Sequence, residues 1–252
     1  MKILVTGGSG FIGKHLVQRL QKLDHIVDIM DYINPNFECN YIGQFVEDCK
    51  DKYDLIYNLA AHSRVDRCEL HDAVDNIETL GRILEKSRHE KTKVIFTSSW
   101  LAKFPHSSYY AYSKKSCEDL CALYRRIGVN IQVARISNVY GNNHSEPTII
   151  DRLLNNEDIP IYTKYTRNFI HVSDVVTNLI EISENNIQYA EISHETYTID
   201  ELVELFGLQN VEKTDAPNNI VRFYGDMSNC NILSKPKFNL KDFVLNYRYF
   251  KC

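Results

Sequence analysis

In the first half of the chain, short apolar runs alternate with longer stretches in which apolar residues recur at helical spacing. The short runs predict buried strands, and the spaced stretches predict amphipathic helices. We expect strands over residues 3–5, 25–30, 54–62, 93–99 and 131–136, and helices over 11–20, 72–88 and 111–126. Strands that alternate with helices through short connections are typical of a Rossmann-type α/β fold with a doubly wound parallel sheet.

After Gly141 this alternation is lost. The pattern there predicts isolated elements: a helix over 148–154, a strand over 159–162, a helix over 172–184 and a helix that opens at Thr198. We therefore predict a nucleotide-binding domain at 1–141 and a smaller, substrate-binding lobe at 142–252, with the strand and helix near 165–184 returning to the first domain. Such a lobe would cover the carboxyl ends of the strands, where a doubly wound sheet binds its ligands.

Composition narrows the class of protein without identifying it. The 252 residues are 44% hydrophobic and 25% charged, and 29 basic against 33 acidic residues give a net charge of −4, so a nucleic-acid partner is not expected. No apolar run is long enough to span a membrane, and Lys2 leads directly into the first strand, which leaves no room for a signal peptide. The seven cysteines contain no C-x-x-C pair, so we expect reduced thiols in the cytoplasm and no metal site.

A glycine-rich turn follows the first strand and precedes the first helix. Its glycines allow two registers: Gly8, Gly10 and Gly13, or Gly7, Gly10 and Gly13. Because glycine has no side chain, a pyrophosphate can approach the backbone of the turn, and the N–H groups at the start of the helix face the anion. A glycine-rich turn can also be only a tight loop, but its position between strand and helix favours dinucleotide binding.

Asp31 ends the second predicted strand, eighteen residues after Gly13. A carboxylate at this position can accept hydrogen bonds from the adenosine ribose hydroxyls, and it would repel a 2′-phosphate. The residue therefore favours NAD over NADP, although an ordinary aspartate in a strand-end turn would give the same sequence.

Tyr110 and Lys114 lie four residues apart and so share one face of a predicted helix. A lysine ammonium near a phenol favours the phenolate, which predicts a lowered pKa for Tyr110. Such a tyrosine can remove a proton from a substrate hydroxyl, while Ser99 could hold the reacting oxygen by a hydrogen bond. The Tyr-x-x-x-Lys spacing is common by chance, but here it follows a dinucleotide turn and a strand that ends in hydroxyl residues.

Several segments of the chain share a pattern with one enzyme family. They are 6–13 (T-G-G-S-G-F-I-G), 58–62 (N-L-A-A-H), 76–81 (N-I-E-T-L-G), 135–141 (R-I-S-N-V-Y-G) and 167–176 (R-N-F-I-H-V-S-D-V-V). These segments resemble those of the extended short-chain dehydrogenases/reductases, in particular the NAD-dependent epimerase/dehydratase group that acts on nucleotide sugars. The resemblance covers nearly the whole chain and selects the register of Gly7, Gly10 and Gly13.

The resemblance implies roles for individual residues. The catalytic residues would be Ser99, Tyr110 and Lys114. The NAD-binding residues would be Gly7, Gly10, Phe11, Ile12, Asp31, Tyr32, Leu59, Ala60, Ala61, Thr97, Tyr110 and Lys114. The residues that bind the diphosphate of a UDP-sugar would be Asn138, Arg167 and Arg222.

The reaction expected from this resemblance is epimerisation at C4 of a UDP-hexose. Tyr110 would take the hydroxyl proton while the hydride passes to the nicotinamide, and the keto-sugar would turn over before the hydride returns. A dehydrogenase or keto-reductase that oxidises or reduces the sugar once is one alternative, and a non-catalytic NAD-binding regulatory protein is another. Helices 72–88 and 111–126 would pack against a second copy of the chain to form a homodimer.

Three features depart from the family pattern or stay open. Only eleven positions separate Ser99 from Tyr110, so this segment is short. Trp100 and Leu101 stand where a dehydratase would carry an Asp-Glu pair, which counts against a 4,6-dehydratase. Arg135 could contact the substrate or pack and pair under the sheet, whereas His62, His171 and Asp174 are expected to be structural.

Overall fold

The computed structural model describes residues 1–31, 49–142, 148–155, 161–162, 166–208, 213–214 and 235–251. The chain forms two compact units. The first contains residues 1–135 and 179–190, and the second contains 136–178 and 191–252. The division at residue 141 expected from the sequence stays a prediction.

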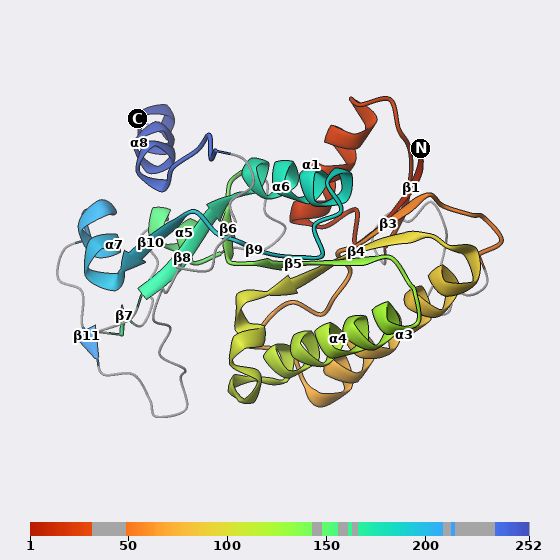
Figure 1. The fold of residues 1–252 in the computed structure, drawn as a ribbon. Helices are drawn as coiled ribbons and strands as arrows, with labels where there is room; N and C mark the ends of the chain where they lie inside the picture. The colour runs from red at the N-terminus through yellow and green to blue at the C-terminus, as the bar shows by residue number, and fades with distance from the viewer. Residues whose placement is uncertain are drawn as a thin grey trace. The chain divides into compact units, whose positions relative to one another are not determined.

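A six-stranded sheet forms the centre of the first unit, in the order β2-β1-β3-β4-β5-β9 (Figure 1). The strands are β1 (Lys2–Thr6), β2 (Ile26–Met30), β3 (Leu55–Asn58), β4 (Lys93–Ser99), β5 (Ile131–Ile136) and β9 (Tyr189–Ile192). β1 pairs in parallel with β2 on one side and with β3 on the other, and β3 pairs in parallel with β4. The strand order therefore reverses beside β1, and the predicted doubly wound Rossmann fold is confirmed.

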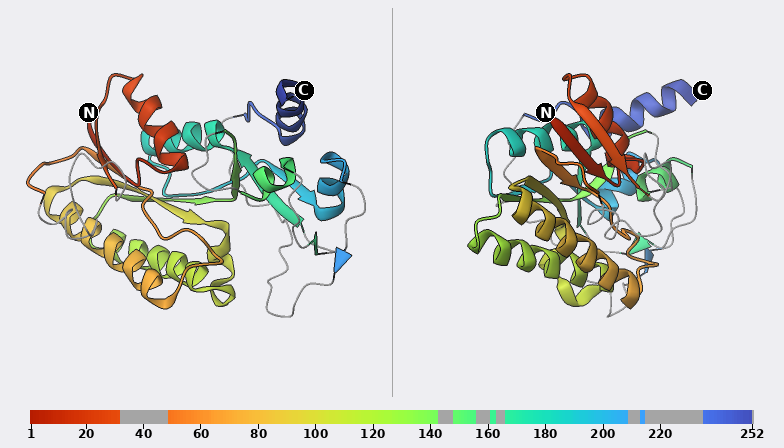
Figure 2. Two further views of the ribbon diagram at one scale, coloured as in Figure 1. Left: turned by 180° about the vertical axis from the view of Figure 1, so that it is seen from behind. Right: turned by 90° about the vertical axis from the view of Figure 1, so that its right-hand side faces the viewer.

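Helices cover both faces of this sheet (Figures 1 and 2). α1 (Phe11–Gln21) and the part of α6 (Val172–Glu184) that begins at Leu179 lie on one face. α3 (Leu70–Glu90) and α4 (Tyr109–Arg126) pack side by side on the other. The core beneath α3 and α4 consists of apolar side chains from alternate strand positions and from both helices, among them Leu4, Ile56, Leu80, Ile83, Leu84, Val94, Phe96, Cys117, Cys121, Ile131 and Val133.

The second unit contains a small sheet in the order β10-β8-β6. β8 (Thr166–His171) pairs in parallel with β6 (Asn138–Tyr140) and antiparallel with β10 (Glu195–Thr198), while β7 (Ile161–Tyr162) pairs with β11 (Lys213–Thr214). The helices are α5 (Ile149–Leu154), α7 (Ile199–Leu205) and α8 (Leu240–Lys251). The predicted start of α7 is confirmed, because Thr198 and Glu201 form a capping box. An apolar core joins these elements through Tyr140, Ile150, Leu153, Phe169, Leu202, Phe206, Leu240 and Val244.

Two carboxylates hold the segment that leads into α8. Asp174 accepts hydrogen bonds from the backbone N–H groups of Lys237 (3.1 Å) and Phe238 (3.3 Å). Glu195 accepts one from the N–H of Leu240 at 2.8 Å. The His171 ring stacks on Phe238 with a centroid distance of 4.1 Å, and the structural roles expected for His171 and Asp174 stay predictions.

The cysteines that the structure describes are free thiols. Cys117 and Cys121 are buried on α4, and burial raises the pKa of Cys117 to about 12 and that of Cys121 well above its usual value. Among the described residues, no helix is long and apolar enough to cross a membrane.

Candidate active site

The glycine turn between β1 and α1 is built from backbone contacts that leave no space for side chains. Gly7 has a positive φ of +71°, and the Gly10 N–H donates to its carbonyl at 3.1 Å. A Cβ atom on Gly13 would lie 2.1 Å from the same carbonyl, and one on Gly7 would lie 2.7 Å from the Ala60 nitrogen. At Gly8 the nearest obstacle to a Cβ is a side-chain atom, Ile29 Cγ2. The close backbone contacts thus agree with the register of Gly7, Gly10 and Gly13.

The glycine turn leads directly into the start of α1. Gly10 is the N-cap residue and provides no side-chain hydrogen bond, and the first turn of α1 contains no acidic residue. Phe11 and Ile12 are the first helical residues and are half-buried. A helix N-terminus of this kind fits the pyrophosphate of a dinucleotide.

Asp31 lies directly after β2, and its Oδ2 atom accepts a hydrogen bond from the Ser9 N–H at 2.9 Å. This bond holds the carboxylate beside the glycine turn, where a ribose hydroxyl could reach it. Tyr32, the next expected cofactor contact, lies outside the described residues.

The segment after β3 is held against the glycine turn by Thr6. The Thr6 carbonyl accepts from the Leu59 N–H at 3.1 Å, and its hydroxyl contacts the Ala60 N–H at 3.4 Å and the Asn58 side chain at 2.7 Å. Leu59, Ala60 and Ala61 are half-buried here. The predicted strand over 54–62 is therefore shorter than expected and ends at Asn58. This segment lies beside Gly7, and Asp31 lies beside Ser9, so the residues expected to contact the adenosine diphosphate part of NAD surround one turn. We call this turn and its flanking residues the glycine cradle.

Ser99, Tyr110 and Lys114 come together where β4 is followed by α4. Tyr110 is 9% exposed and Lys114 is 4% exposed. The Lys114 Nζ atom donates to the Thr97 carbonyl at 2.9 Å and lies 5.7 Å from the centre of the Tyr110 ring. The Ser99 hydroxyl hydrogen-bonds the Tyr110 phenol. The Thr97 hydroxyl donates to the Asn58 carbonyl at 2.9 Å, which ties this junction to β3.

The expected lowering of the Tyr110 pKa is wrong for the protein in this form. Burial raises the pKa of Tyr110 to about 12, and the hydrogen bond from Ser99 opposes this rise without cancelling it. Burial also lowers the pKa of Lys114. The sequence shows that the two side chains share a helix face, but it does not show that both are removed from water.

Asn76 links the segment after β3 to α4 through its side chain. Its Oδ1 atom accepts from the His62 N–H at 2.8 Å, and its Nδ2 atom donates to the Ser113 hydroxyl at 3.2 Å. Asn76 is buried within α3, and Ser113 precedes Lys114. Sequence reasoning assigned Asn76 no role, although a polar amide on the buried side of a helix is a signal for such a contact.

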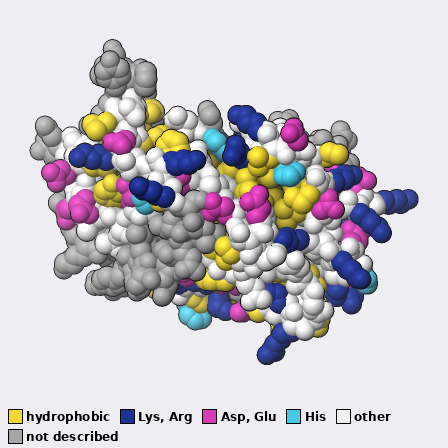
Figure 3. Space-filling model, turned by 45° about the horizontal axis from the view of Figure 1, so that its top comes forward, with side chains coloured by type: hydrophobic (Ala, Val, Ile, Leu, Met, Phe, Trp, Pro, Cys, Tyr) yellow, Lys and Arg dark blue, Asp and Glu magenta, His cyan; other side chains and the backbone are white. Residues whose placement is uncertain are grey.

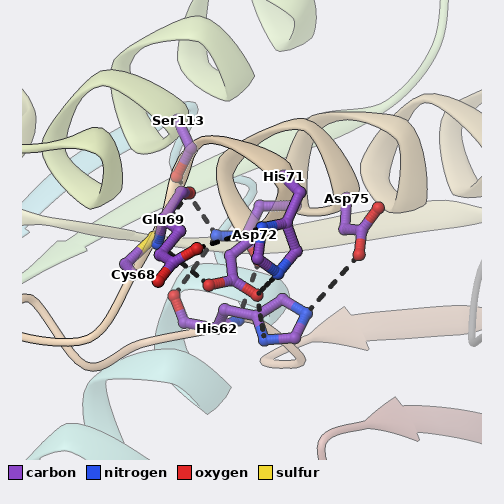
Figure 4. A network of polar contacts seen from close by, with 8 residues as sticks. His62, Cys68, Glu69, His71, Asp72, Asp75 and Ser113 are labelled. Carbon is purple, nitrogen blue, oxygen red and sulfur yellow. Dashed lines mark hydrogen bonds and ion pairs between the residues drawn. The ribbon is translucent and has the colours of Figure 1, made fainter.

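The His62 imidazole lies between two carboxylates of α3 (Figure 4). Its Nδ1 atom is 3.2 Å from Asp72 and its Nε2 atom is 3.8 Å from Asp75. Asp72 also accepts the Glu69 N–H as part of the capping box that starts the helix. These contacts hold the His62 ring against the start of α3, and its structural role stays a prediction.

The short segment between Ser99 and Tyr110 folds into two 3₁₀ turns, η1 (Trp100–Lys103) and η2 (Pro105–Ser107), which the sequence did not predict. Ser99 caps the first by accepting from the Leu101 N–H at 3.2 Å. The Lys103 Nζ atom lies 3.7 Å from the centre of the Trp100 ring. No aspartate or glutamate occurs between Ser99 and Lys115.

Arg135 pairs under the sheet, which answers the question left open by the sequence. Its guanidinium holds Glu118 with two bonds, Nε to Oε1 at 3.0 Å and Nη2 to Oε2 at 2.5 Å. The Ser98 hydroxyl donates to the same carboxylate at 2.5 Å. Sequence reasoning missed Glu118, although its position four residues after Lys114 places both on one helix face.

The expected substrate residues belong to the second unit. Asn138 lies on β6, and its Nδ2 atom donates to the Asn168 carbonyl at 2.9 Å. Arg167 lies on β8 opposite Tyr197 of β10. Arg222 lies outside the described residues, and the roles of all three stay predictions.

Figure 3 shows one face of the molecule, where the described basic side chains lie among acidic ones.

The fold and the glycine cradle define a dinucleotide-binding protein of the Rossmann class. The chain belongs to the NAD-dependent epimerase/dehydratase family, whose model matches residues 3–193.

Individual proteins of known sequence or structure support the same family. The chain is 29% identical, over 291 aligned positions and 95% of each chain, to a Methanocaldococcus jannaschii protein described as "Putative UDP-glucose 4-epimerase". It is 30% identical to a dTDP-glucose 4,6-dehydratase of an Actinoplanes species, over 69% of this chain and 70% of that one. The crystal structure of a Thermotoga maritima UDP-glucose 4-epimerase with UDP-glucose is 25% identical, with a TM-score of 0.81 and coverage of 100% of this chain and 99% of that one.

Proposed function

We propose that the chain is an NAD-dependent epimerase that inverts C4 of a UDP-hexose, with Tyr110 as acid and base. The observation that carries the proposal is the junction of Ser99, Tyr110 and Lys114 at the end of β4, in the same unit as the glycine cradle. Similarity to the Methanocaldococcus and Thermotoga proteins over nearly the whole chain supports the choice of reaction.

Each residue of the junction has a distinct part in this proposal. NAD, when bound, supplies a hydride acceptor and a positive ring charge. Tyr110 takes the proton of the sugar hydroxyl and later returns it, and Ser99 holds the reacting oxygen by a hydrogen bond. Lys114 holds the cofactor ribose and adds positive charge beside the phenol. Because burial raises the pKa of Tyr110 to about 12, the phenolate depends on these positive charges.

The short segment after Ser99 favours epimerisation over dehydration. Loss of water from the sugar requires an additional acid and base, and residues 99–115 provide no carboxylate. A dehydrogenase or keto-reductase that turns over once per coenzyme is the main alternative, followed by an NAD-binding regulatory protein.

The substrate diphosphate is proposed to bind residues of the C-terminal part of the chain. Arginine is suited to this role because its guanidinium holds phosphate oxygens in pairs, and Arg167 and Arg222 are the candidates. Asn138 would add an amide donor. The substrate-binding lobe expected over residues 142–252, apart from the strand and helix near 165–184, is a separate proposal, because Asn138 and Arg167 lie outside that lobe.

A comparison of two tyrosine variants tests the proposed reaction. Tyr110→Phe should lower kcat for conversion of UDP-glucose to UDP-galactose by about 10²–10⁴-fold, because proton transfer is lost. Tyr112→Phe is the matched control, since Tyr112 lies on the same helix, is 54% exposed and has no lysine four residues later. The readout is the sugar composition of the product mixture together with free NADH.

Three results would contradict the proposal in different ways. Release of NADH in proportion to product would indicate a dehydrogenase. NAD binding without turnover of any UDP-hexose by the wild-type protein would indicate a regulatory protein. Equal activity of the Tyr110→Phe and wild-type proteins would remove Tyr110 from the mechanism.

We also propose a homodimer formed through the outer faces of α3 and α4. Several large apolar or aromatic side chains on these helices are more than half exposed: Leu70, Val74, Tyr109, Tyr112 and Leu123. Leu70 and Val74 are one helical turn apart, and a contiguous apolar patch on a surface marks a protein interface. Light scattering coupled to size-exclusion chromatography should give twice the mass of the chain for the wild-type protein. Leu123→Glu should lower the measured mass towards that of one chain. A monomeric wild-type protein would contradict the proposal.

The cytoplasm remains the proposed location. It is supported by the free thiols at Cys49, Cys68, Cys117 and Cys121, since thiols persist in a reducing compartment. Fractionation of cells that express the protein would test this proposal.

A further inference from the structure

Arg135 and Glu118 form a buried ion pair next to Lys114. The two charged side chains are 11% and 10% exposed. We propose that Arg135 is a positioning residue that occupies both carboxylate oxygens of Glu118 and thereby keeps Lys114 available for the cofactor. The inference rests on the proposed role of Lys114.

The position of the pair follows from the pattern of side chains on the sheet. On the face that α3 and α4 cover, β4 presents Val94 and Phe96 to the core, and β5 presents Ile131 and Val133. The next residues with the same orientation are polar in both strands: Ser98 in β4 and Arg135 in β5. A buried carboxylate beneath the carboxyl ends of these strands is thus held by a hydroxyl and a guanidinium.

Glu118 could otherwise form an ion pair with Lys114. The two residues are four positions apart on α4, the spacing at which lysine and glutamate side chains meet on a helix. In the structure Lys114 instead donates to the Thr97 carbonyl at 2.9 Å, while Arg135 takes both oxygens of the carboxylate. The Lys114 ammonium therefore stays on the Tyr110 side of the junction, 5.7 Å from the centre of the phenol ring.

Arg135 is itself held in place by neighbouring groups. Its guanidinium carbon lies 5.2 Å from the centre of the Tyr189 ring, at the start of β9. Stacking on an aromatic ring and a two-bonded contact to a carboxylate both require the planar guanidinium, which lysine does not provide. Loss of Arg135 would leave Glu118 buried and uncompensated, with Lys114 four residues before it on the same helix, while Lys115 is paired with Asp119.

The test uses two variants that break the same ion pair but leave opposite charges behind. Arg135→Gln leaves the Glu118 carboxylate, whereas Glu118→Gln leaves the guanidinium and keeps an acceptor for Ser98. The double variant, Arg135→Gln with Glu118→Gln, leaves neither charge. For each full-length protein, calorimetry measures the dissociation constant for NAD, a sugar assay measures kcat, and thermal unfolding measures Tm.

We expect Arg135→Gln to raise the dissociation constant for NAD and lower kcat, each by at least about tenfold, because Lys114 is drawn to Glu118. Glu118→Gln and the double variant should stay within about threefold of the wild-type protein in both measurements, even where Tm falls, because no carboxylate remains to attract Lys114. If the pair were merely structural, the double variant would bind NAD as weakly and turn over as slowly as Arg135→Gln. That result would overturn the proposal. Impairment of NAD binding by Glu118→Gln equal to that by Arg135→Gln would also overturn it.

Two features keep the test decisive. NAD affinity is measured independently of turnover, so a wild-type protein that binds NAD but epimerises no sugar would contradict the proposed function and still test Arg135. If Arg135→Gln does not fold, Arg135→Lys replaces it, because one ammonium cannot hold both carboxylate oxygens as the guanidinium does. The Arg135→Lys protein should bind NAD more weakly than the wild-type protein, and adding Glu118→Gln to it should restore the affinity. The proposal would be overturned if Arg135→Lys left the NAD affinity unchanged, or if Glu118→Gln did not restore it.

Discussion

The glycine turn after β1 and the junction of β4 with α4 lie in the same unit but are stabilised in opposite ways. The turn depends on missing side chains, since a Cβ atom on Gly13 would lie 2.1 Å from the Gly7 carbonyl. The junction depends on particular side chains, since Lys114 holds the Thr97 carbonyl and Glu118 holds the Ser98 hydroxyl. We therefore expect the turn to be sensitive to added atoms and the junction to be sensitive to lost polar groups.

The two regions also differ in the balance of stability and reactivity. In the turn, close packing and backbone hydrogen bonds favour the folded state directly. In the junction, a buried phenol and a buried ammonium are kept away from water, which is unfavourable unless a ligand uses them. Added atoms in the turn should therefore change mainly stability, whereas substitutions of Tyr110 and Lys114 in the junction should change mainly activity.

The largest effect that separates the two regions is expected from Lys114→Met. Methionine has a similar length and no charge, so the unfolding free energy should stay within about 1 kcal/mol of the wild-type value, because relief of the buried charge offsets the lost hydrogen bond to the Thr97 carbonyl. The value of kcat should fall by about 10²–10³-fold, because the charge beside Tyr110 is lost. Denaturant unfolding and a steady-state assay provide the two values. A large loss of stability with little loss of kcat would reverse the contrast between junction and turn.

A smaller effect is expected from Gly13→Ala. The added methyl group collides with the Gly7 carbonyl, and overpacking of this kind costs about 1–3 kcal/mol of unfolding free energy. Gly81→Ala is the matched control, because Gly81 is also helical but its nearest neighbour would be 3.7 Å from the new Cβ, at Leu120. That variant should gain about 0.5–1 kcal/mol from helix propensity. Equal stabilities of the two variants would show that the turn can relax.

The smallest effect concerns the pH dependence of stability at Tyr110. The folded protein retains the phenol proton up to a pKa of about 12, whereas the unfolded chain releases it near pH 10, so the unfolding free energy falls as the pH rises between these values. At pH 11 the loss should be about 1.4 kcal/mol. Comparison of the wild-type and Tyr110→Phe proteins at pH 8 and pH 11 isolates this group, because the other tyrosines contribute equally to both. A stability difference between them that does not change with pH would contradict the raised pKa.

The sequence predicted the turn and most of the first unit because their signals are local. Apolar runs, helical spacing and the glycines at 7, 10 and 13 lie within a few residues of the elements they specify. The capping box at Thr198 and Glu201 is equally local. The family resemblance then agreed with the matched family model over residues 3–193.

Features that depend on contacts between residues distant in the sequence were either not predicted or predicted wrongly. The strand β3 ends at Asn58 because Thr6 takes the next backbone donors, and α8 is preceded by a segment that Asp174 and Glu195 hold. The pairing of Glu118 with Arg135 joins a helix to a strand 17 positions away. The direction of the Tyr110 pKa depends on burial, which residue spacing does not reveal. The individual roles of the site residues stay predictions.

The two thiols on α4 provide a built-in probe of the junction. Cys117 and Cys121 are buried in the core beneath α3 and α4, and their raised pKa values keep them protonated and unreactive. Alkylating reagents should therefore modify them only when α4 separates from its neighbours, whereas the half-buried Cys68 should react sooner. The kinetics of their labelling, followed by mass spectrometry, would report how often the helix that bears Tyr110 and Lys114 opens.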